Sequence, residues 1–230
     1  RAGAPFVKIF EEERELTVML VVDVSASGEF GSRGRWKGEV AVEICALLAF
    51  SAIKNNDKVG LIIVSDRIEK FVPPRKGRKH VLRVLRELLF HEPEGRGTDL
   101  TVALEYLNHV QRKKAVAFLV SDFQDEGFDR ALAVAGRRHD LIAVRLGDRR
   151  ERTLPPLGYL ELEDPETGDR VVVNTSDETF RSNFERQVTE RAAGLDRALR
   201  KSKVDVIDIE TGEPYVKPLM RFFQDRARRQ

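Results

Sequence analysis

The strongest hydrophobic signal in the chain is a continuous apolar run at residues 16–22, rich in β-branched side chains, which stops at Asp23. A run without polar alternation is typical of a strand that is buried on both faces of a sheet, so we expect it at the centre. Shorter runs of the same kind recur at residues 59–64, 116–120, 141–144 and 204–209. The pattern therefore predicts a sheet made of several buried strands.

Most of these runs are separated by segments with apolar positions three or four residues apart, which is the spacing of an amphipathic helix. Three such faces are formed by Val40, Ile44, Leu47 and Leu48, by Val81, Leu82, Leu85 and Leu88, and by Leu100, Ala103, Leu104 and Leu107. Strands that alternate with helices indicate a largely parallel sheet with helices on both faces. In such a sheet the carboxyl ends of the strands meet at one edge, where ligands bind.

One run departs from this alternation. Residues 68–72 follow Ser65 and Asp66 too closely for a crossover helix, so they are expected to return as an antiparallel edge strand. The predicted fold is an α/β, Rossmann-like, doubly wound sheet that is mostly parallel.

The later part of the chain adds elements to this sheet. Residues 159–173 are predicted to form a β-hairpin with Pro165 and Gly168 in its turn, within an insertion that spans residues 155–175. Residues 178–200 and 215–227 are expected as helices. We expect one domain over residues 1–230, and because it starts at Arg1 without a methionine, we also expect that an upstream portion is missing.

Oxygen-bearing side chains follow three of the predicted elements. Asp23, Ser25 and Ser27 alternate after the first strand, Thr98 precedes a helix, and Asp122 follows the strand at 116–120. Because these positions belong to the same sheet edge, a hard cation such as magnesium, calcium or manganese could be held there. The alternative is local: Thr98 or the next residue caps a helix, and the carboxylates begin turns.

The pattern Asp23-x-Ser25-x-Ser27, then Thr98, then Asp122 resembles the metal-ion-dependent adhesion site of von Willebrand factor A-like domains. The resemblance implies that Ser25, Ser27 and Thr98 offer hydroxyls to Mg²⁺ or Mn²⁺, while Asp23 and Asp122 act directly or through water. It also implies a von Willebrand factor A-like fold, and a partner protein whose Asp or Glu carboxylate completes the coordination.

A second resemblance covers nearly the whole chain. The segments FEEERELTVMLVVDVSAS, GTDL, SDF, DPETG and FFQDR are similar to the bacterial domain-of-unknown-function family fifty-eight. Members of that family are encoded beside MoxR-type AAA ATPases, which implies an adaptor or assembly factor that works with such an ATPase or its client. The acidic, Trp-containing segment expected upstream is absent, and Gly28 stands where a bulkier residue is common.

Composition and charge limit the classes of partner and the location that we expect. The chain has 40 basic and 38 acidic residues, and a net charge of +2 creates no field that would attract nucleic acid. No segment reaches the roughly eighteen apolar residues that span a bilayer, so no membrane segment is expected in this piece. The single cysteine, Cys45, is expected to be a buried thiol in a reducing compartment, which favours a cytoplasmic location.

We expect this protein to bind a partner protein and not to catalyse a reaction. The main alternative is a metal-dependent phosphoesterase, in which Asp23 attacks phosphorus or Asp23, Asp122 and Asp125 hold catalytic metals. An aspartyl phosphatase needs a second carboxylate two residues after the nucleophile, and that position is Ser25. A third possibility is a scaffold whose polar edge binds nothing.

Overall fold

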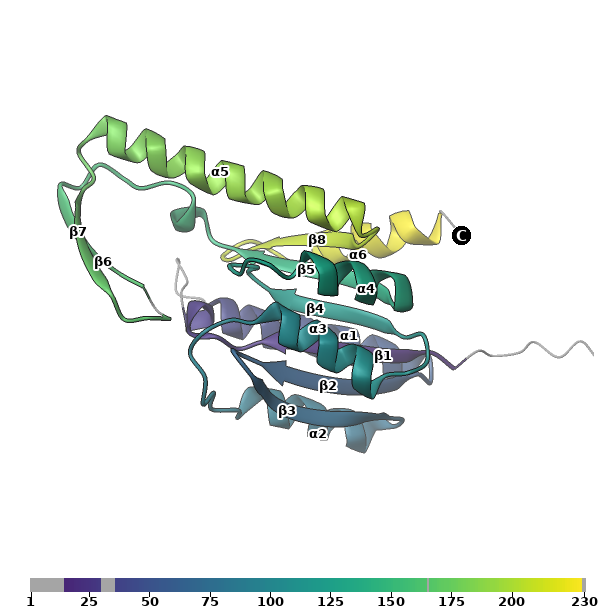
Figure 1. The fold of residues 1–230 in the computed structure, drawn as a ribbon. Coiled ribbons are helices and arrows are strands. Elements are labelled where there is room, and N and C mark those ends of the chain that lie inside the picture. Colours follow the sequence, from purple (N-terminus) through teal and green to yellow (C-terminus); the bar gives the residue numbers. More distant parts are fainter. Residues whose placement is uncertain (1–14, 30–35, 165, 229–230) are drawn as a thin grey trace, which may run out of the picture.

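The computed structural model describes residues 15–29, 36–164 and 166–228, and its centre is a six-stranded sheet (Figure 1). Its strands are, in spatial order, β3 (Ile68–Arg75), β2 (Lys58–Val64), β1 (Thr17–Asp23), β4 (Val116–Ser121), β5 (Asp140–Gly147) and β8 (Asp205–Glu210). Every neighbouring pair is parallel except β2 with β3. The predicted mostly parallel sheet with one antiparallel edge strand is confirmed.

Helices cover both faces of the sheet, with α3 in front of it and α1 behind it in Figure 1. The face behind packs against α1 (Lys37–Lys54), α2 (Arg78–Leu89) and α6 (Val216–Ala227). The other face packs against α3 (Leu100–Val110), α4 (Asp129–Arg138) and α5 (Glu178–Lys201). Among the described residues no helix is both long enough and apolar enough to cross a membrane.

The central position of β1 follows from its side chains. Leu20 and Val22 enter the core on the α1 side, whereas Met19 and Val21 enter the core on the α3 side. All four are essentially inaccessible to solvent. Because successive strand residues point to opposite faces, only a continuous apolar run can fill two cores.

Two short elements continue from strand ends at the carboxyl edge. The 3-10 helix η1 (Ala26–Glu29) follows β1, and η2 (Arg149–Glu151) follows β5. Asp148 caps η2 by accepting a hydrogen bond from the amide of Arg150, and the amide of Asp148 donates to the Glu151 carboxylate. Both elements therefore place polar side chains beside the ends of the central strands.

The expected hairpin is formed by β6 (Tyr159–Glu163) and β7 (Arg170–Asn174). Figure 1 shows it extending from the end of the sheet at which β1 and β2 finish. Gly168 lies in its turn with a φ of 76°, a conformation that suits glycine. Pro165, the other residue expected in the turn, lies outside the described residues.

Candidate metal centre

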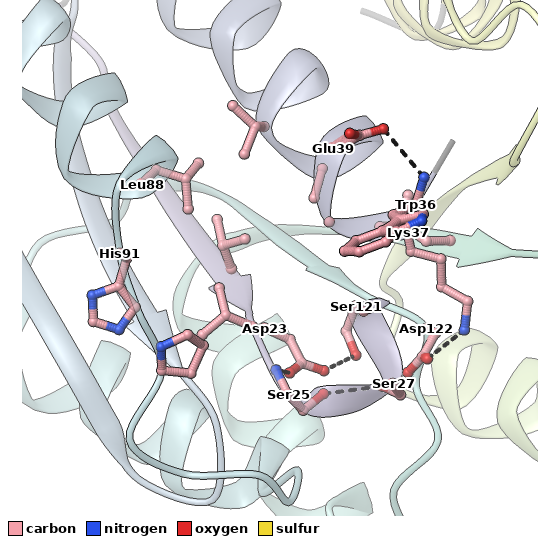
Figure 2. Close-up of a pocket in the computed structure, with 18 of the residues that line it drawn as sticks. Asp23, Ser25, Ser27, Trp36, Lys37, Glu39, Leu88, His91, Ser121 and Asp122 are labelled. Carbon is pink, nitrogen blue, oxygen red and sulfur yellow. Dashed lines mark hydrogen bonds and ion pairs between the residues drawn. The ribbon is translucent and has the colours of Figure 1, made fainter. Parts of the chain in front are cut away.

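Four of the five residues singled out by the sequence line one pocket at the carboxyl edge: Asp23, Ser25, Ser27 and Asp122 (Figure 2). The pocket has a volume of about 720 Å³ and also borders the start of α1 and the end of α2. Thr98 is not part of its lining, but the loop before α3 is tied to η1, since the Ala26 amide donates to the Arg96 carbonyl over 3.0 Å. The five residues thus come from three neighbouring loops.

The Asp23 carboxylate is held by neutral donors. Its Oδ1 accepts from the Ser25 amide at 2.9 Å, and its Oδ2 accepts from the Ser121 hydroxyl at 2.6 Å. Burial raises the pKa of Asp23 to about 6, although both hydrogen bonds favour the ionised form. In the described parts of the chain no Lys, Arg or His forms an ion pair with this carboxylate.

Ser25 and Ser27 bring two hydroxyls together beside Asp23. Their Oγ atoms are 3.0 Å apart, and the residues are only 3% and 5% exposed. Ser25 directly precedes η1 and Ser27 lies within it, so both hydroxyls follow closely on the end of β1. These hydroxyls are partnered with each other and face the pocket (Figure 2).

Asp122 has a cationic partner that the sequence did not reveal. The Lys37 ammonium lies 2.7 Å from Asp122 Oδ2 (Figure 2). The same ammonium also contacts Glu151. Burial lowers the pKa of Lys37, but the two carboxylates more than offset this and the net shift is upward. One carboxylate at the pocket is therefore neutralised by the protein itself, whereas Asp23 is not.

The Thr98 side chain does not cap α3. That role belongs to Asp99, whose carboxylate accepts from the Val102 amide at 2.9 Å. The Thr98 hydroxyl instead donates to Glu166 of the hairpin turn at 2.7 Å. The sequence left open whether Thr98 or the next residue caps this helix. The cap is Asp99, so the Thr98 hydroxyl is not used for capping.

Glu69 of β3 anchors the loop that carries Thr98. Its carboxylate accepts from the amides of Gly95 at 2.8 Å and Glu94 at 3.2 Å, and from the Ser65 hydroxyl at 2.6 Å. Burial opposes ionisation of Glu69, yet these three donors prevail and lower its pKa.

The Asp125 carboxylate has a structural role, because both of its oxygens accept hydrogen bonds from backbone amides. Its Oδ2 accepts from the Leu100 amide at 2.8 Å, and its Oδ1 accepts from the Glu126 amide at 2.7 Å. It therefore helps to satisfy the free amides at the start of α3. In the described part of the chain, no group of three or more His, Cys, Asp or Glu side chains is arranged to hold a metal ion.

Three residues of this region were not assigned from the sequence. Ser121 directly precedes Asp122, and a hydroxyl next to a candidate carboxylate is a signal that could have found it. Lys37 and Glu166 carry no comparable signal, because their partners lie 85 and 68 residues away in the chain.

Comparison with known proteins gives relatives over almost the full length. Residues 1–194 match the family described as "Protein of unknown function DUF58". The uncharacterized protein Rv1480 of Mycobacterium tuberculosis is 31% identical over 232 residues, covering 99% of this chain and 73% of that protein. An uncharacterized protein of Mycobacterium avium is 28% identical over 160 residues, covering 68% of this chain and 94% of its own length.

Two solved structures share the fold. The conserved hypothetical protein BatB from Bacteroides thetaiotaomicron has a TM-score of 0.59 at 15% identity, covering 93% of this chain and 99% of its own. An aerotolerance-related membrane protein from Bacteroides fragilis has a TM-score of 0.56 at 16% identity, covering 84% and 91%. At these identities the likeness concerns the fold alone.

Proposed function

The chain belongs to the DUF58 family and has a von Willebrand factor A-like fold, and we propose that it is a metal-dependent protein-interaction module. The residues proposed to hold Mg²⁺ or Mn²⁺ are Asp23, Ser25, Ser27, Thr98 and Asp122. The proposed ligand of the loaded site is a carboxylate of a partner protein.

The observation that carries the proposal is the Asp23 carboxylate among neutral donors, next to two converging hydroxyls. A partly buried anion without an ion-pair partner is stabilised by a nearby cation. The 3.0 Å between the Ser25 and Ser27 oxygens also suits this purpose. Adjacent ligands of an octahedral magnesium ion are about 3 Å apart when each lies about 2.1 Å from the metal.

Charge balance supports an outside anion as the ligand. Three of the five proposed donors are neutral hydroxyls, and the Asp122 carboxylate already has the Lys37 ammonium as its partner. The protein therefore compensates a divalent charge only in part, and the bound metal would supply a Lewis-acidic position for one more oxygen. An Asp or Glu side chain from another protein has the required charge and hardness.

For the partner we propose a MoxR-type AAA ATPase or its client, on the strength of the family resemblance. In this role the protein acts as an adaptor or assembly factor. A pull-down with the ATPase should require magnesium, and it should be lost when Ser25→Ala and Thr98→Ala are combined. Capture that persists in this double variant would count against the proposed binding mode.

We do not propose a phosphoesterase, because both Asp125 oxygens accept from backbone amides and Ser25 stands where an aspartyl phosphatase needs a second carboxylate. Release of phosphate from a generic phosphoester that disappears in Asp23→Asn would overturn the proposal of a non-catalytic module.

The first experiment is thermal unfolding with chelator and then with increasing Mg²⁺ or Mn²⁺. Metal at a hundredfold excess over its Kd should add about 2.7 kcal/mol of stability, or about 5 to 10 °C in Tm for a chain of this size. Asp23→Asn should lose this shift. Asp129→Asn, which changes an exposed aspartate at the start of α4, should keep it. Equal behaviour of wild type and Asp23→Asn would refute a metal site at Asp23.

A further inference from the structure

A hairpin residue reaches the proposed metal site. Glu166 Oε1 accepts a hydrogen bond from the Thr98 hydroxyl at 2.7 Å. A Cβ atom added to Gly97 would lie 3.8 Å from the other Glu166 oxygen, so the carboxylate also lies against the backbone of that loop. The protein thus brings one of its own carboxylates to Thr98, one of the five residues proposed to hold the metal.

The hairpin turn holds Glu166 in an ordered arrangement. The Asp164 carboxylate accepts from the amides of Glu166 at 2.9 Å and Thr167 at 3.2 Å. The Asp164 backbone pairs with Gly168 and Asp169 at 2.8 Å each. These bonds fix the turn locally, so little entropy is lost when its carboxylate engages an oxygen-binding site.

The hairpin is anchored at its base. Thr175 is inaccessible to solvent, and its hydroxyl donates to the Gly158 carbonyl at 2.8 Å and accepts from the Leu157 amide at 3.0 Å. The strands beyond this anchor bury little, since Val171 is 56% and Val172 is 65% exposed. The tip can therefore leave Thr98 without exposing a large apolar surface.

We propose that Glu166 is an internal carboxylate ligand of the metal site, and that the hairpin occupies the position which a partner's carboxylate must take. The inference rests on the proposed function. Thr98 gives its hydroxyl proton to Glu166 and keeps its oxygen lone pairs for a cation. The 2.7 Å between the two oxygens is close to the roughly 3 Å that separates adjacent ligands of an octahedral magnesium ion.

The test is a Mn²⁺ titration followed by the relaxation rate of water protons, which rises with the number of water molecules on the bound ion. Glu166→Gln should bind Mn²⁺ about tenfold more weakly and give a higher relaxation rate per bound ion, because water replaces the lost carboxylate. The matched control is Glu161→Gln, an exposed carboxylate of β6 on the same hairpin, and it should behave as wild type.

Acetate serves as the probe for the vacated position, with chloride at equal ionic strength as its control. It should lower the relaxation rate of the Glu166→Gln complex and leave the wild-type complex unchanged. Equal affinity, relaxation and acetate response in Glu166→Gln and wild type would overturn the inference alone. Absence of Mn²⁺ binding in wild type would overturn the proposed function, and the inference with it.

Discussion

The Lys37 ammonium and the Asp122 carboxylate form an ion pair of 2.7 Å in which the side chains are only 2% and 4% exposed. Glu151 contacts the same ammonium. The pair joins the first turn of α1 to the end of β4, so it fixes the helix beside the proposed metal site.

Replacing this lysine should be costly. Lys37→Met keeps the length of the side chain but leaves the buried Asp122 and the partly buried Glu151 without their cation, which should lower the free energy of unfolding by about 3 to 5 kcal/mol. Urea denaturation measures the loss. Lys70→Met removes an exposed pair with Glu87 and should cost less than about 1 kcal/mol. A similarly small loss for Lys37→Met would show that the buried pair is not a stabilising element.

Glu69 should make stability depend on acid pH. Its pKa is lowered in the folded protein, so its contribution is fully present above about pH 4.3, the ordinary pKa of a glutamate, and is lost as the pH falls through the lowered value. Glu69→Gln should cost about 2 kcal/mol at neutral pH and progressively less in acid. The comparison is urea denaturation of wild type and variant between neutral pH and pH 3, with exposed Glu92→Gln as the control.

Two glycines of the loop before α3 should respond differently to alanine. A Cβ atom on Gly95 would lie 2.2 Å from Asp66 Oδ1 and 2.3 Å from Ser65 Oγ, whereas the nearest atom to a Cβ on Gly97 is 3.6 Å away. Gly95→Ala should therefore displace the loop, cost about 1 to 3 kcal/mol and weaken Mn²⁺ binding. Gly97→Ala should be tolerated in both measurements, and an equal effect of the two changes would contradict this account.

Variants of Asp125 and Asp23 should distinguish a structural carboxylate from one that is proposed to bind metal. Asp125→Ala removes the acceptor for the Leu100 amide and should cost about 1 kcal/mol, the usual loss at a helix start. Its Mn²⁺ affinity should stay that of wild type, while Asp23→Asn loses binding. Isothermal titration calorimetry of the two variants distinguishes these roles. Loss of Mn²⁺ binding in Asp125→Ala would place this residue in the metal site instead.

The sheet could be predicted because its signals are local. The run that forms β1 has no polar break, and the short connection at Ser65 and Asp66 leaves no room for a crossover before β3. The helix α4 was harder to single out, since its buried face consists only of Ala131, Leu132 and Ala135.

The site was only partly predictable, because its remaining members depend on contacts between distant segments. Asp23, Ser25 and Ser27 share one short turn and could be read as a group. By contrast, no spacing rule connects Lys37 with Asp122 or Glu166 with Thr98, since α1 and the hairpin reach these residues through the packing of the whole sheet. Charged residues on a helix start or in a hairpin turn are ordinary surface features in a sequence.

The hairpin that carries Glu166 in its turn is covalently part of the molecule. Glu166 and a partner's carboxylate therefore do not compete for the metal site on equal terms. A tethered group acts at an effective concentration in the millimolar range however dilute the protein becomes. A rival that offers one carboxylate and nothing else would compete poorly at ordinary cellular concentrations. A binding partner must therefore bring further contacts, so that selectivity resides in the surface around the site and not in the carboxylate itself.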